Sequence, residues 1–343
     1  MVVAYDRQGF YADTLIAAVD TFDVSRYAGF VYGSGFEAQP ELLSRIAAKL
    51  PLIGNAPDAV AAVKTQTVFF AALQRLNINY PQVLNSLPDD QPGRYLMKYA
   101  GGSGGMHIFS ASNNTALSEN YYYQQKIDGC PVSLLFLANK HSIEVIDFNE
   151  QWLSPSADFP YRYGGAVGNA ALPSSAKQQL MDAAQKLTQA FNLIGLNSLD
   201  AIVEAVSNRV FALEINPRLS ATVDLYNHAD QNLFEKHMQA CSHQASLSQQ
   251  YSYQPKPQCK AHAIVYAAAP ISLSAPILWP VWTTDTPRPG PEVITISASE
   301  PVCSVFAYAD TAGEAKKIAQ DRVGIVQNLL QSLIQKTSGS KKG

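Results

Sequence analysis

The segment from residue 211 to residue 218, Phe-Ala-Leu-Glu-Ile-Asn-Pro-Arg, constrains the fold more than any other part of the chain. Alternate residues of a β-strand point to opposite faces, so the pattern predicts a strand with the apolar residues 211, 213 and 215 on one face. Glu214 and Asn216 then share the other face with residue 212. Pro217 ends the strand, because proline cannot donate to a sheet ladder.

Glu214 and Asn216 thus present a carboxylate and an amide oxygen, two residues apart, at the end of a rigid strand. This arrangement suits Mg²⁺, which takes one or two carboxylates and completes its shell with phosphate oxygens. Arg218 follows in the turn, where a guanidinium can stabilise the charge that develops as a phosphoryl group moves. For this strand alone, the alternative is an ordinary polar strand face followed by a turn.

Length and composition limit the classes of protein that this chain can belong to. Its 343 residues suffice for two or three packed units, and 47% hydrophobic with 15% charged residues is an ordinary globular composition. The formal net charge of -3 gives no electrostatic basis for a nucleic-acid surface. The four cysteines (Cys130, Cys241, Cys259 and Cys303) are far apart, which argues against a zinc or redox motif and for reduced thiols.

The chain also carries no targeting or membrane signal that we can recognise. Its start lacks a basic segment followed by an apolar run, and no apolar run approaches the roughly 18 residues that a spanning helix needs. We therefore expect a soluble, cytoplasmic protein with neither a membrane nor a nucleic acid as partner.

Apolar spacing and turn residues divide the chain into expected elements. Residues 1–55 are expected to form a small α/β unit with strands at 27–32 and 51–54 and a helix at 40–50. Further helices are predicted after residues 56–58 through 63 and at 65–76, 175–191, 221–240 and 312–335. Strands are predicted at 95–100, 106–110, 121–126, 133–139, 142–148, 199–206, 210–215, 261–268, 292–297 and 302–308. Residues 242–258 are expected to form a loop or insertion, and residues 337–343 a disordered tail.

A glycine-rich loop joins two of the predicted strands as the tip of a hairpin. Its residues are Gly101, Gly102, Ser103, Gly104 and Gly105. No Gly-Lys-Ser/Thr ending and no helix follow, which excludes a Walker loop and the dinucleotide fingerprint. The bare backbone can still approach phosphates, and the preceding lysine, Lys98, would add a point charge. A flexible turn beside a surface lysine explains the loop alone equally well.

Asp200, on the preceding strand, is a candidate third oxygen ligand. A three-residue turn at 207–209 would pair Val206 with Val210 and place Asp200 opposite Asn216, so that Asp200, Glu214 and Asn216 share one face. A two-residue turn would put Asp200 on the other face, because a slip of one residue reverses every side chain.

Taken together, these parts resemble the ATP-grasp superfamily, and within it the small archaeal and methylotroph carboxylate–amine ligases. The resemblance covers roughly Asn55 to Gln335, and its strongest motif, residues 214–218, matches the family's Glu-x-Asn-Pro-Arg. It implies that Asp200, Glu214 and Asn216 bind Mg²⁺, for which Mn²⁺ can substitute. Arg218 would stabilise an acyl-phosphate intermediate.

The same resemblance implies a set of ATP contacts. The phosphates would be held by Lys64, Lys98 and the loop 101–105. Lys98 and Arg218 would also be the catalytic residues. Backbone groups of the hinge would receive adenine at Gln124, Gln125, Lys126 and Ile127. Many relatives carry an acid at the start of the hinge and another after its glycine, which bind ribose. This chain has Gln124 or Gln125 and Cys130-Pro131 at these positions, so the residue that contacts ribose stays open.

One subgroup of the superfamily is most similar. Residues 125–133, 163–166, 216–220, 279–290 and 301–306 resemble the group that includes the tyramine–glutamate ligase of methanofuran biosynthesis and similar methylotroph proteins. The N-terminal unit looks shortened relative to the family.

The expected fold class is therefore α+β / α/β: an ATP-grasp fold whose two α+β lobes enclose ATP, behind a shortened α/β unit. We expect an N-terminal domain at 1–55, a small lobe with the glycine loop at 56–126 and a large lobe with the metal site at 127–336. The expected function is an ATP-dependent carboxylate–amine ligase that works through an acyl phosphate. One candidate reaction adds glutamate to a tyramine or tyrosine-type amine. Another ATP-grasp chemistry, such as a carboxylase or nucleotide-biosynthesis ligase, and a non-catalytic ATP-binding module remain alternatives.

The sequence is less informative about the substrates. A small-molecule carboxylate and an amine are the expected partners, and a homodimer is one candidate for the oligomeric state, which stays open. Arg162, Tyr163 and Ser220 are candidate substrate contacts, with structural roles as the alternative. His107 is interpreted as incidental, and the run Tyr121–Tyr123 as strand packing.

Overall fold

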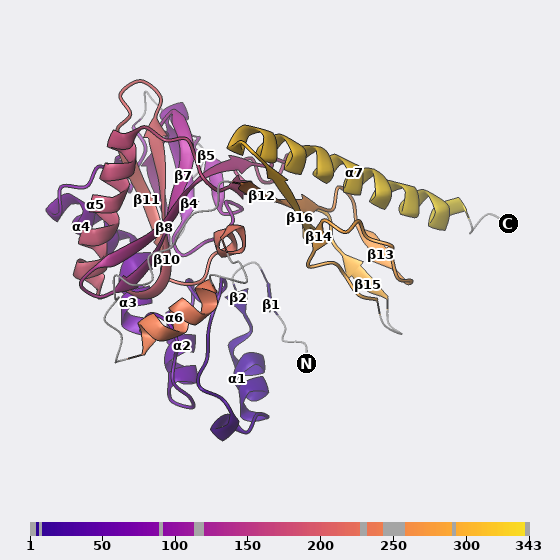
Figure 1. Cartoon of the computed structure of the whole chain (residues 1–343), viewed down its shortest axis with the longest axis horizontal. Coiled ribbons are helices and arrows are strands. Elements are labelled where there is room, and N and C mark those ends of the chain that lie inside the picture. Colours follow the sequence, from indigo (N-terminus) through magenta and orange to yellow (C-terminus); the bar gives the residue numbers. More distant parts are fainter. Residues whose placement is uncertain are drawn as a thin grey trace.

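The computed structural model describes residues 5–6, 9–88, 92–112, 120–226, 232–242, 258–289 and 293–339 (Figure 1). A large antiparallel sheet forms the centre, a small sheet packs beside it, and an N-terminal unit lies below both. The C-terminal helix α7 extends away on the far side. None of the described helices is both long and apolar enough to cross a membrane.

The N-terminal unit is mainly helical. Its elements are β1 (Tyr5–Asp6), β2 (Gly9–Phe10), α1 (Ala12–Asp20), η1 (Val24–Arg26) and α2 (Pro40–Ala47). In place of the expected strands at 27–32 and 51–54, these segments form a single parallel bridge between Phe30 and Leu52. Pro51 limits this pairing because it accepts from the Phe30 N–H but has no N–H of its own to donate.

Two short helices connect this unit to the sheets. They are α3 (Pro57–Lys64) and α4 (Gln66–Arg75), close to their expected positions. Proline at the first turn of α3 is favourable, because the missing N–H would have no partner there. Lys64 is the last residue of α3, so the helix end determines where its ammonium lies.

The small sheet has the strand order β3-β6-β4-β5. Its strands are β3 (Val83–Leu84), β4 (Tyr95–Tyr99), β5 (Ile108–Ser110) and β6 (Tyr121–Gln125), with the turn η2 (Pro92–Arg94) before β4. Lys98 pairs with Ile108, which confirms the predicted hairpin with the glycine loop at its tip.

The large sheet has eight strands in the order β11-β10-β7-β8-β9-β12-β16-β14. Its first five members are β7 (Gly129–Asn139), β8 (Ile143–Leu153), β9 (Tyr163–Val167), β10 (Ile194–Glu204) and β11 (Val210–Asn216). The amphipathic helix α5 (Ser174–Phe191) packs with α4 against one face, through residues such as Leu180 and Leu187. The 3₁₀ turn η3 (Ala221–Leu225) and α6 (Leu233–Cys241) pack against the opposite face.

The C-terminal part forms a separate core under α7 (Ala312–Gly339). Its strands are β12 (Cys259–Tyr266), β13 (Ile271–Leu273), β14 (Thr283–Thr284), β15 (Ile294–Ile296) and β16 (Pro301–Ala309). The expected continuous helix at 221–240 is wrong at its start, where five residues form η3 instead. The expected loop at 242–258 falls almost entirely on residues 243–257, outside the described residues. Helix α7 includes 337–339, and the rest of the expected tail also lies outside them.

Asn55 links the N-terminal unit to the large sheet. Its side chain donates to Asn197 Oδ1 at 2.8 Å and to the Pro217 carbonyl at 2.9 Å, and it accepts from the Ile194 N–H at 2.8 Å. The side chain is almost fully buried, so truncating it leaves these partners without water to replace it.

We expect Asn55→Ala to lower the free energy of unfolding by about 3 kcal/mol, because several buried polar groups lose their partner. Chemical denaturation monitored by circular dichroism measures this. The matched control is Asn79→Ala, an exposed asparagine whose side chain hydrogen-bonds Arg209 and no other described residue, with an expected change within about 0.5 kcal/mol. Equal stability of the two variants would contradict the linking role.

Candidate functional site

The hairpin of β10 and β11 positions the acidic residues, and its register differs from the prediction. Asp200 lies opposite Glu214, and Ser198 opposite Asn216, so the predicted pairing of Asp200 with Asn216 is wrong. The turn is longer than three residues, because Val203 is the residue opposite Val210. A regular ladder from that pair would put Asp200 opposite Leu213.

A β-bulge corrects this mismatch. The register shifts between Asp200 and Ala201, which face Glu214 and Ala212, so Leu213 is the extra residue of β11. Ala212 therefore belongs to the core together with Ile215, while Leu213 lines a narrow space beside Glu214. The predicted strict alternation is wrong at these two residues. The prediction that the three oxygen-bearing residues share a face is nevertheless met.

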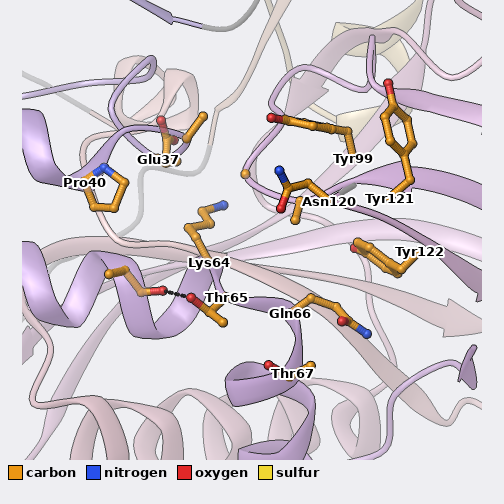
Figure 2. A pocket seen from close by; sticks show the side chains of 14 residues that line it. Glu37, Pro40, Lys64, Thr65, Gln66, Thr67, Tyr99, Asn120, Tyr121 and Tyr122 are labelled. Atoms are coloured by element: carbon orange, nitrogen blue, oxygen red, sulfur yellow. Dashed lines mark hydrogen bonds between the residues drawn. The ribbon is translucent and has the colours of Figure 1, made fainter. Parts of the chain in front are cut away.

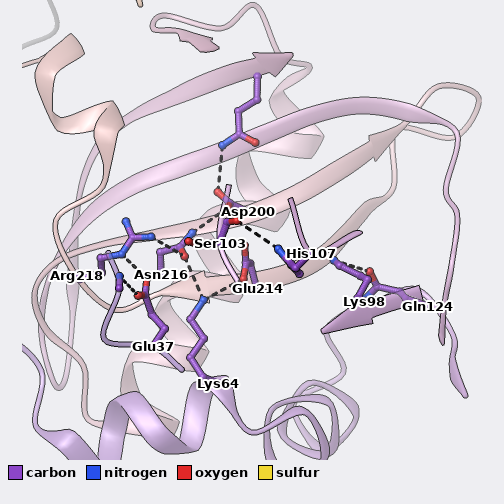
Figure 3. Close-up of polar contacts among 12 residues, drawn as sticks. Glu37, Lys64, Lys98, Ser103, His107, Gln124, Asp200, Glu214, Asn216 and Arg218 are labelled. Atoms are coloured by element: carbon purple, nitrogen blue, oxygen red, sulfur yellow. Dashed lines mark hydrogen bonds and ion pairs between the residues drawn. The ribbon is translucent and has the colours of Figure 1, made fainter. Parts of the chain in front are cut away.

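The three predicted metal ligands lie close together, with Asn216 in contact with Asp200 and Lys64 between Asn216 and Glu214 (Figure 3). Asn216 Nδ2 donates to Asp200 Oδ2 at 2.8 Å. Lys64 Nζ, from the end of α3, donates to Glu214 Oε2 at 3.0 Å and to Asn216 Oδ1 at 3.1 Å. Gln151 Nε2 from β8 donates to the other Asp200 oxygen at 3.3 Å. We call Asp200, Glu214 and Asn216 the oxygen cluster.

Burial and charge separate the two carboxyl groups of this cluster. Burial, together with the nearby Glu214 charge, raises the pKa of Asp200 to about 7. Burial also acts to raise the pKa of Glu214, but Lys64 and Lys98 outweigh it and lower that pKa to about 2. Two close carboxylates that share one lysine favour the binding of a further cation.

The chemistry of the cluster fits Mg²⁺. Two carboxylates and an amide offer oxygen atoms only, which is the set a hard cation prefers. No group of three or more His, Cys, Asp or Glu side chains in the described part of the chain could hold a metal by itself. A metal here would need oxygens from another molecule, as Mg²⁺ commonly takes from phosphates.

We expect Mg²⁺ to bind about tenfold more weakly at about pH 6 than at about pH 8, because Asp200 must lose its proton first. An acid whose folded pKa is raised makes the metal-free protein less stable as the pH rises from its unfolded pKa of about 4 towards about 7. Mg²⁺ should therefore raise the melting temperature more at the higher pH. Titration calorimetry and thermal melting measure both effects. Equal Mg²⁺ affinity at the two pH values would contradict this account.

Lys98 provides a buried positive charge next to the cluster. Its side chain on β4 is buried, and Nζ donates to Gln124 Oε1 at 3.1 Å. Burial lowers the pKa of Lys98, although Glu214 opposes this effect. Gln124 Nε2 is buried without a hydrogen-bond partner among the described residues. In the described part of the chain this ammonium hydrogen-bonds an amide oxygen and no carboxylate, and an unused N–H donor lies beside it, which suits an anionic ligand.

The rest of the predicted hinge leads from β6 towards β7. Gln125 and Lys126 donate their backbone N–H groups to Gln82 and Arg94 at 2.8 Å each. Lys126 is exposed, and Ile127 is half-buried. The hinge thus begins at the end of β6 in the small sheet and leads into β7 of the large sheet.

The glycine loop lies folded against both neighbouring parts of the molecule. The Gly104 carbonyl accepts from the Tyr163 N–H at 2.9 Å. Gly105, at φ +71°, passes so close to Tyr161 that an added Cβ would lie 2.0 Å from its carbonyl oxygen. Gly101, at φ +78°, approaches segment 37–38 less closely, since an added Cβ would lie 3.1 Å from Ala38 Cα. Side chains at these two positions would strain the backbone, and at Gly105 would also disturb the packing of the loop.

His107 follows this loop and lies beside Glu214, and its interpretation as incidental stays a prediction. Burial and then the charge of Lys98 lower its pKa to about 4, while Glu214 opposes them. The ring lines the narrow space that also contacts Lys98, Glu214 and Leu213. Its position next to the glycine loop was the only signal in the sequence.

Glu37 is a site residue that the sequence did not reveal. It lies in the N-terminal unit after Gly35, whose N–H donates to its Oε2 at 2.9 Å. Arg218 Nε donates to its Oε1 at 2.5 Å, while the other guanidinium nitrogens contact the Leu219 carbonyl at 3.1 Å and Asn216 Oδ1 at 3.5 Å. Glu37 thereby holds the guanidinium beside the oxygen cluster.

The three candidate substrate contacts, Arg162, Tyr163 and Ser220, lie in different surroundings. Arg162 is structural: its Nε donates to the Ser154 carbonyl at 2.9 Å and its guanidinium lies over the Tyr266 ring. Tyr163 is close enough to Asp200 for that charge to raise its pKa, after burial as the larger cause. Ser220 hydrogen-bonds Thr222 at 2.7 Å, at the start of η3.

Comparison with known proteins agrees with this geometry. Residues 63–222 match the family model described as an ATP-grasp domain. This region, just under half of the chain, therefore resembles an ATP-grasp domain. No curated protein matches the chain.

Solved structures extend the likeness beyond the ATP-grasp domain. Biotin carboxylase from Campylobacter jejuni, in a complex with β,γ-ATP, is 13% identical, with a TM-score of 0.68 over 91% of this chain and 77% of that one. L-amino acid ligase from Bacillus licheniformis is also 13% identical, with a TM-score of 0.65 over 90% and 82%. Pyruvate carboxylase from Rhizobium etli is 15% identical, with a TM-score of 0.69 over 91% of this chain, which spans only 32% of that protein. The chain has the ATP-grasp fold.

Proposed function

We propose that this protein is an ATP-dependent carboxylate–amine ligase that forms an amide through an acyl phosphate. The observation that carries the proposal is one constellation within the ATP-grasp fold. Four separate segments bring together the oxygen cluster, Lys64, Lys98 and Arg218 next to the glycine loop. Phosphoryl transfer requires such parts: acids that bind a cation, buried lysines that bind phosphates, and a guanidinium held in place.

In this proposal the chain's own residues hold ATP at several points. Lys98, Lys64 and the backbone of the loop 101–105 bind the phosphates, and hinge residues 124–127 receive adenine. Mg²⁺, or Mn²⁺ in its place, would be held by the oxygen cluster and would neutralise phosphate charge. Loop closure would exclude water from the acyl phosphate, which otherwise hydrolyses.

The reaction balances without a protein nucleophile. A carboxylate oxygen of the acid attacks the γ-phosphorus of ATP, and the bond to the β-γ bridging oxygen breaks to release ADP. The amine then attacks the acyl carbon, inorganic phosphate leaves, and the nitrogen loses a proton. Arg218 stabilises the charge on the transferring group and on the tetrahedral oxyanion.

The finer assignments rest on the sequence resemblance. We propose glutamate as the acid and a tyramine or tyrosine-type amine as its partner, in the formation of a methanofuran-like C1 cofactor in the cytoplasm. We also propose that residues 1–55, 56–126 and 127–336 act as the N-terminal domain and the two lobes around ATP. A homodimer is the proposed assembly.

Trapping of the acyl phosphate tests the proposed function directly. The protein is incubated with Mg-ATP, hydroxylamine and one acid at a time, starting with L-glutamate, and both hydroxamate and ADP are measured. We expect hydroxamate that depends on ATP and on the acid. ADP release that requires bicarbonate instead would identify a carboxylase. ATP binding without turnover for every acid would favour a non-catalytic module.

A further inference from the structure

Tyr163 and His262 form a polar pair on the same sheet face as the oxygen cluster. Tyr163 lies on β9 and His262 on β12, and a hydrogen bond of 2.8 Å joins Oη to Nε2. His262 is buried, whereas Tyr163 is half-buried. Two groups that can each donate or accept a proton, in contact beside a reaction centre, are candidates for a role in the reaction.

The register of the large sheet connects this pair to the oxygen cluster. Gln151, Ala166 and His262 lie opposite one another on β8, β9 and β12, so they share a face. Gln151 donates to Asp200, which shows that the cluster lies on this face too. Burial and then the Asp200 charge raise the pKa of Tyr163. The Tyr163 hydroxyl group therefore contacts His262 while it lies within electrostatic reach of Asp200.

The backbone of Tyr163 is fixed at both of its polar groups. Its N–H donates to the carbonyl of Gly104 in the glycine loop at 2.9 Å, and its carbonyl accepts from the Tyr266 hydroxyl group at 2.8 Å. Gly165 allows β9 and β12 to approach closely, because an added Cβ would lie 2.3 Å from the His262 carbonyl oxygen. The pair is therefore held rigidly and is attached to the loop that would cover ATP.

The groups proposed to hold the nucleotide form a different wall of the site. A cavity of about 420 Å³ there is lined by Lys64 and Gly101, which belong to the proposed phosphate site (Figure 2). Its walls come from the N-terminal unit, from the junction of α3 and α4, and from the small sheet. Tyr122 and Tyr123 of that sheet also pack in apolar cores, as expected for strand packing. Tyr163 approaches the oxygen cluster from the large sheet instead.

The hydrogen bond between the two rings can run in either direction. Burial and the nearby Lys260 charge lower the pKa of His262 to about 4, so the imidazole is neutral and has one N–H donor and one acceptor nitrogen. If Tyr163 donated to His262, only its oxygen lone pairs would face Asp200 and the anions of the reaction. If the Nε2–H of His262 donates, the phenol O–H is free to point at these anions, which is the electrostatically favourable arrangement.

We propose that Tyr163 contacts the carboxylate of the acid substrate, and that His262 is a positioning residue that keeps the phenol proton directed at it. The acid must lie beside the oxygen cluster to attack the γ-phosphorus of ATP. A neutral donor orients its carboxylate without the tight ground-state binding of an ion pair, which would oppose the attack. The inference rests on the proposed function for the identity of the acid as a substrate, whereas the hydrogen bond and the binding of the acid do not depend on turnover.

Hydroxamate kinetics of the full chain test the contact, with the acid that gives the most hydroxamate. We expect Tyr163→Phe to raise the KM for this acid about tenfold and to leave the KM for ATP within about twofold, because one hydrogen bond to a charged group is lost. The matched control is Tyr161→Phe, whose exposed hydroxyl group contacts Ser110 and which should leave both KM values unchanged. Equal KM values for the acid in the two variants, or an equal rise in the KM for ATP, would overturn the proposal.

Two variants of His262 separate positioning from packing. His262→Gln keeps an N–H donor at the place of Nε2 and should hold the KM for the acid within about twofold, whereas His262→Leu removes the donor and should raise it about fivefold. The NMR shifts of the two ring nitrogens in the ligand-free wild type should show the proton on Nε2 of His262. A proton on Nδ1 alone would overturn the positioning role, whether or not the two variants fold.

Calorimetry distinguishes failure of this proposal from failure of the proposed function. Each acid of the panel, starting with L-glutamate, is titrated into the full chain with Mg-ADP, so that no turnover is needed. Binding that Tyr163→Phe weakens about tenfold, without hydroxamate from any acid, would overturn the proposed function and leave the contact in place. Hydroxamate with equal acid affinities in Tyr163→Phe and Tyr161→Phe would overturn the contact alone. If no acid binds or reacts, both are overturned.

Discussion

Glu214→Gln is expected to lower kcat for ADP release at least about a thousandfold. Gln keeps the shape and can still accept from Lys64, but it removes one of the two charges that the oxygen cluster offers to a cation. Loss of a charge that stabilises a phosphoryl-transfer transition state typically costs two to three orders of magnitude or more. The same variant should lose the stabilisation against heat that Mg-ATP gives the wild type.

The fold of this variant should remain intact. Removing the Glu214 charge weakens the contact with Lys64 but also relieves the repulsion that raises the pKa of Asp200. These two changes oppose each other in the metal-free protein, so we expect a change in unfolding free energy within about 1 kcal/mol. The control is Glu204→Gln at the end of the same hairpin, where the carboxylate hydrogen-bonds Ser207 and no other side chain of the residues that the structure describes. Wild-type turnover by Glu214→Gln would refute the assignment of the oxygen cluster.

The sequence was most informative where the chemistry is local. Glu214, Asn216 and Arg218 lie within five residues, so their types and spacing predict a polar strand end whatever the remaining fold. The long amphipathic helix at 175–191 was predictable for the same reason, because its apolar stripe repeats over several turns. The structure places both close to the predicted positions.

The register of the hairpin shows why pairing is harder to predict. Predicted and observed partners of Asp200 differ by two residues, Asn216 against Glu214, and a shift of two keeps the same face. The face was therefore correct although the turn was wrong. No local pattern marks the bulge at Leu213, an apolar residue in an apolar strand, so its exit from the core could not be foreseen.

Residues that join distant segments were missed for a related reason. Glu37 and Arg218 are 181 residues apart, and only the folded chain shows that they pair. Asn55 is similar, since its partners lie on β10 and in the turn at Pro217. A single sequence carries no signal for such contacts, because a lone acid or amide in a loop is usually solvated.

Groups of the chain itself orient the Arg218 guanidinium. Glu37 fixes Nε, and the Leu219 carbonyl and Asn216 Oδ1 lie within reach of the two terminal nitrogens. Glu37 is itself buried and supported by the Gly35 N–H, so the pair is held rigidly. A charge fixed in this way stabilises a developing oxyanion without having to reorganise during the reaction.

Arg218→Lys is therefore expected to lower kcat for amide formation about a hundredfold, with a much smaller effect on the KM for ATP. Lysine keeps the charge, but its single nitrogen lacks the planar fork of donors through which Arg218 contacts Glu37, the Leu219 carbonyl and Asn216 in fixed directions. Product formation at saturating substrates measures the effect, and hydroxamate formation shows whether the acyl phosphate step is slowed as well. The matched control is Arg209→Lys, an exposed arginine in the β10–β11 turn that contacts Asn79 and Phe211 and should stay within about twofold of wild type. If both variants behave alike, positive charge alone is sufficient at residue 218, and the fixed orientation by Glu37 has no catalytic value.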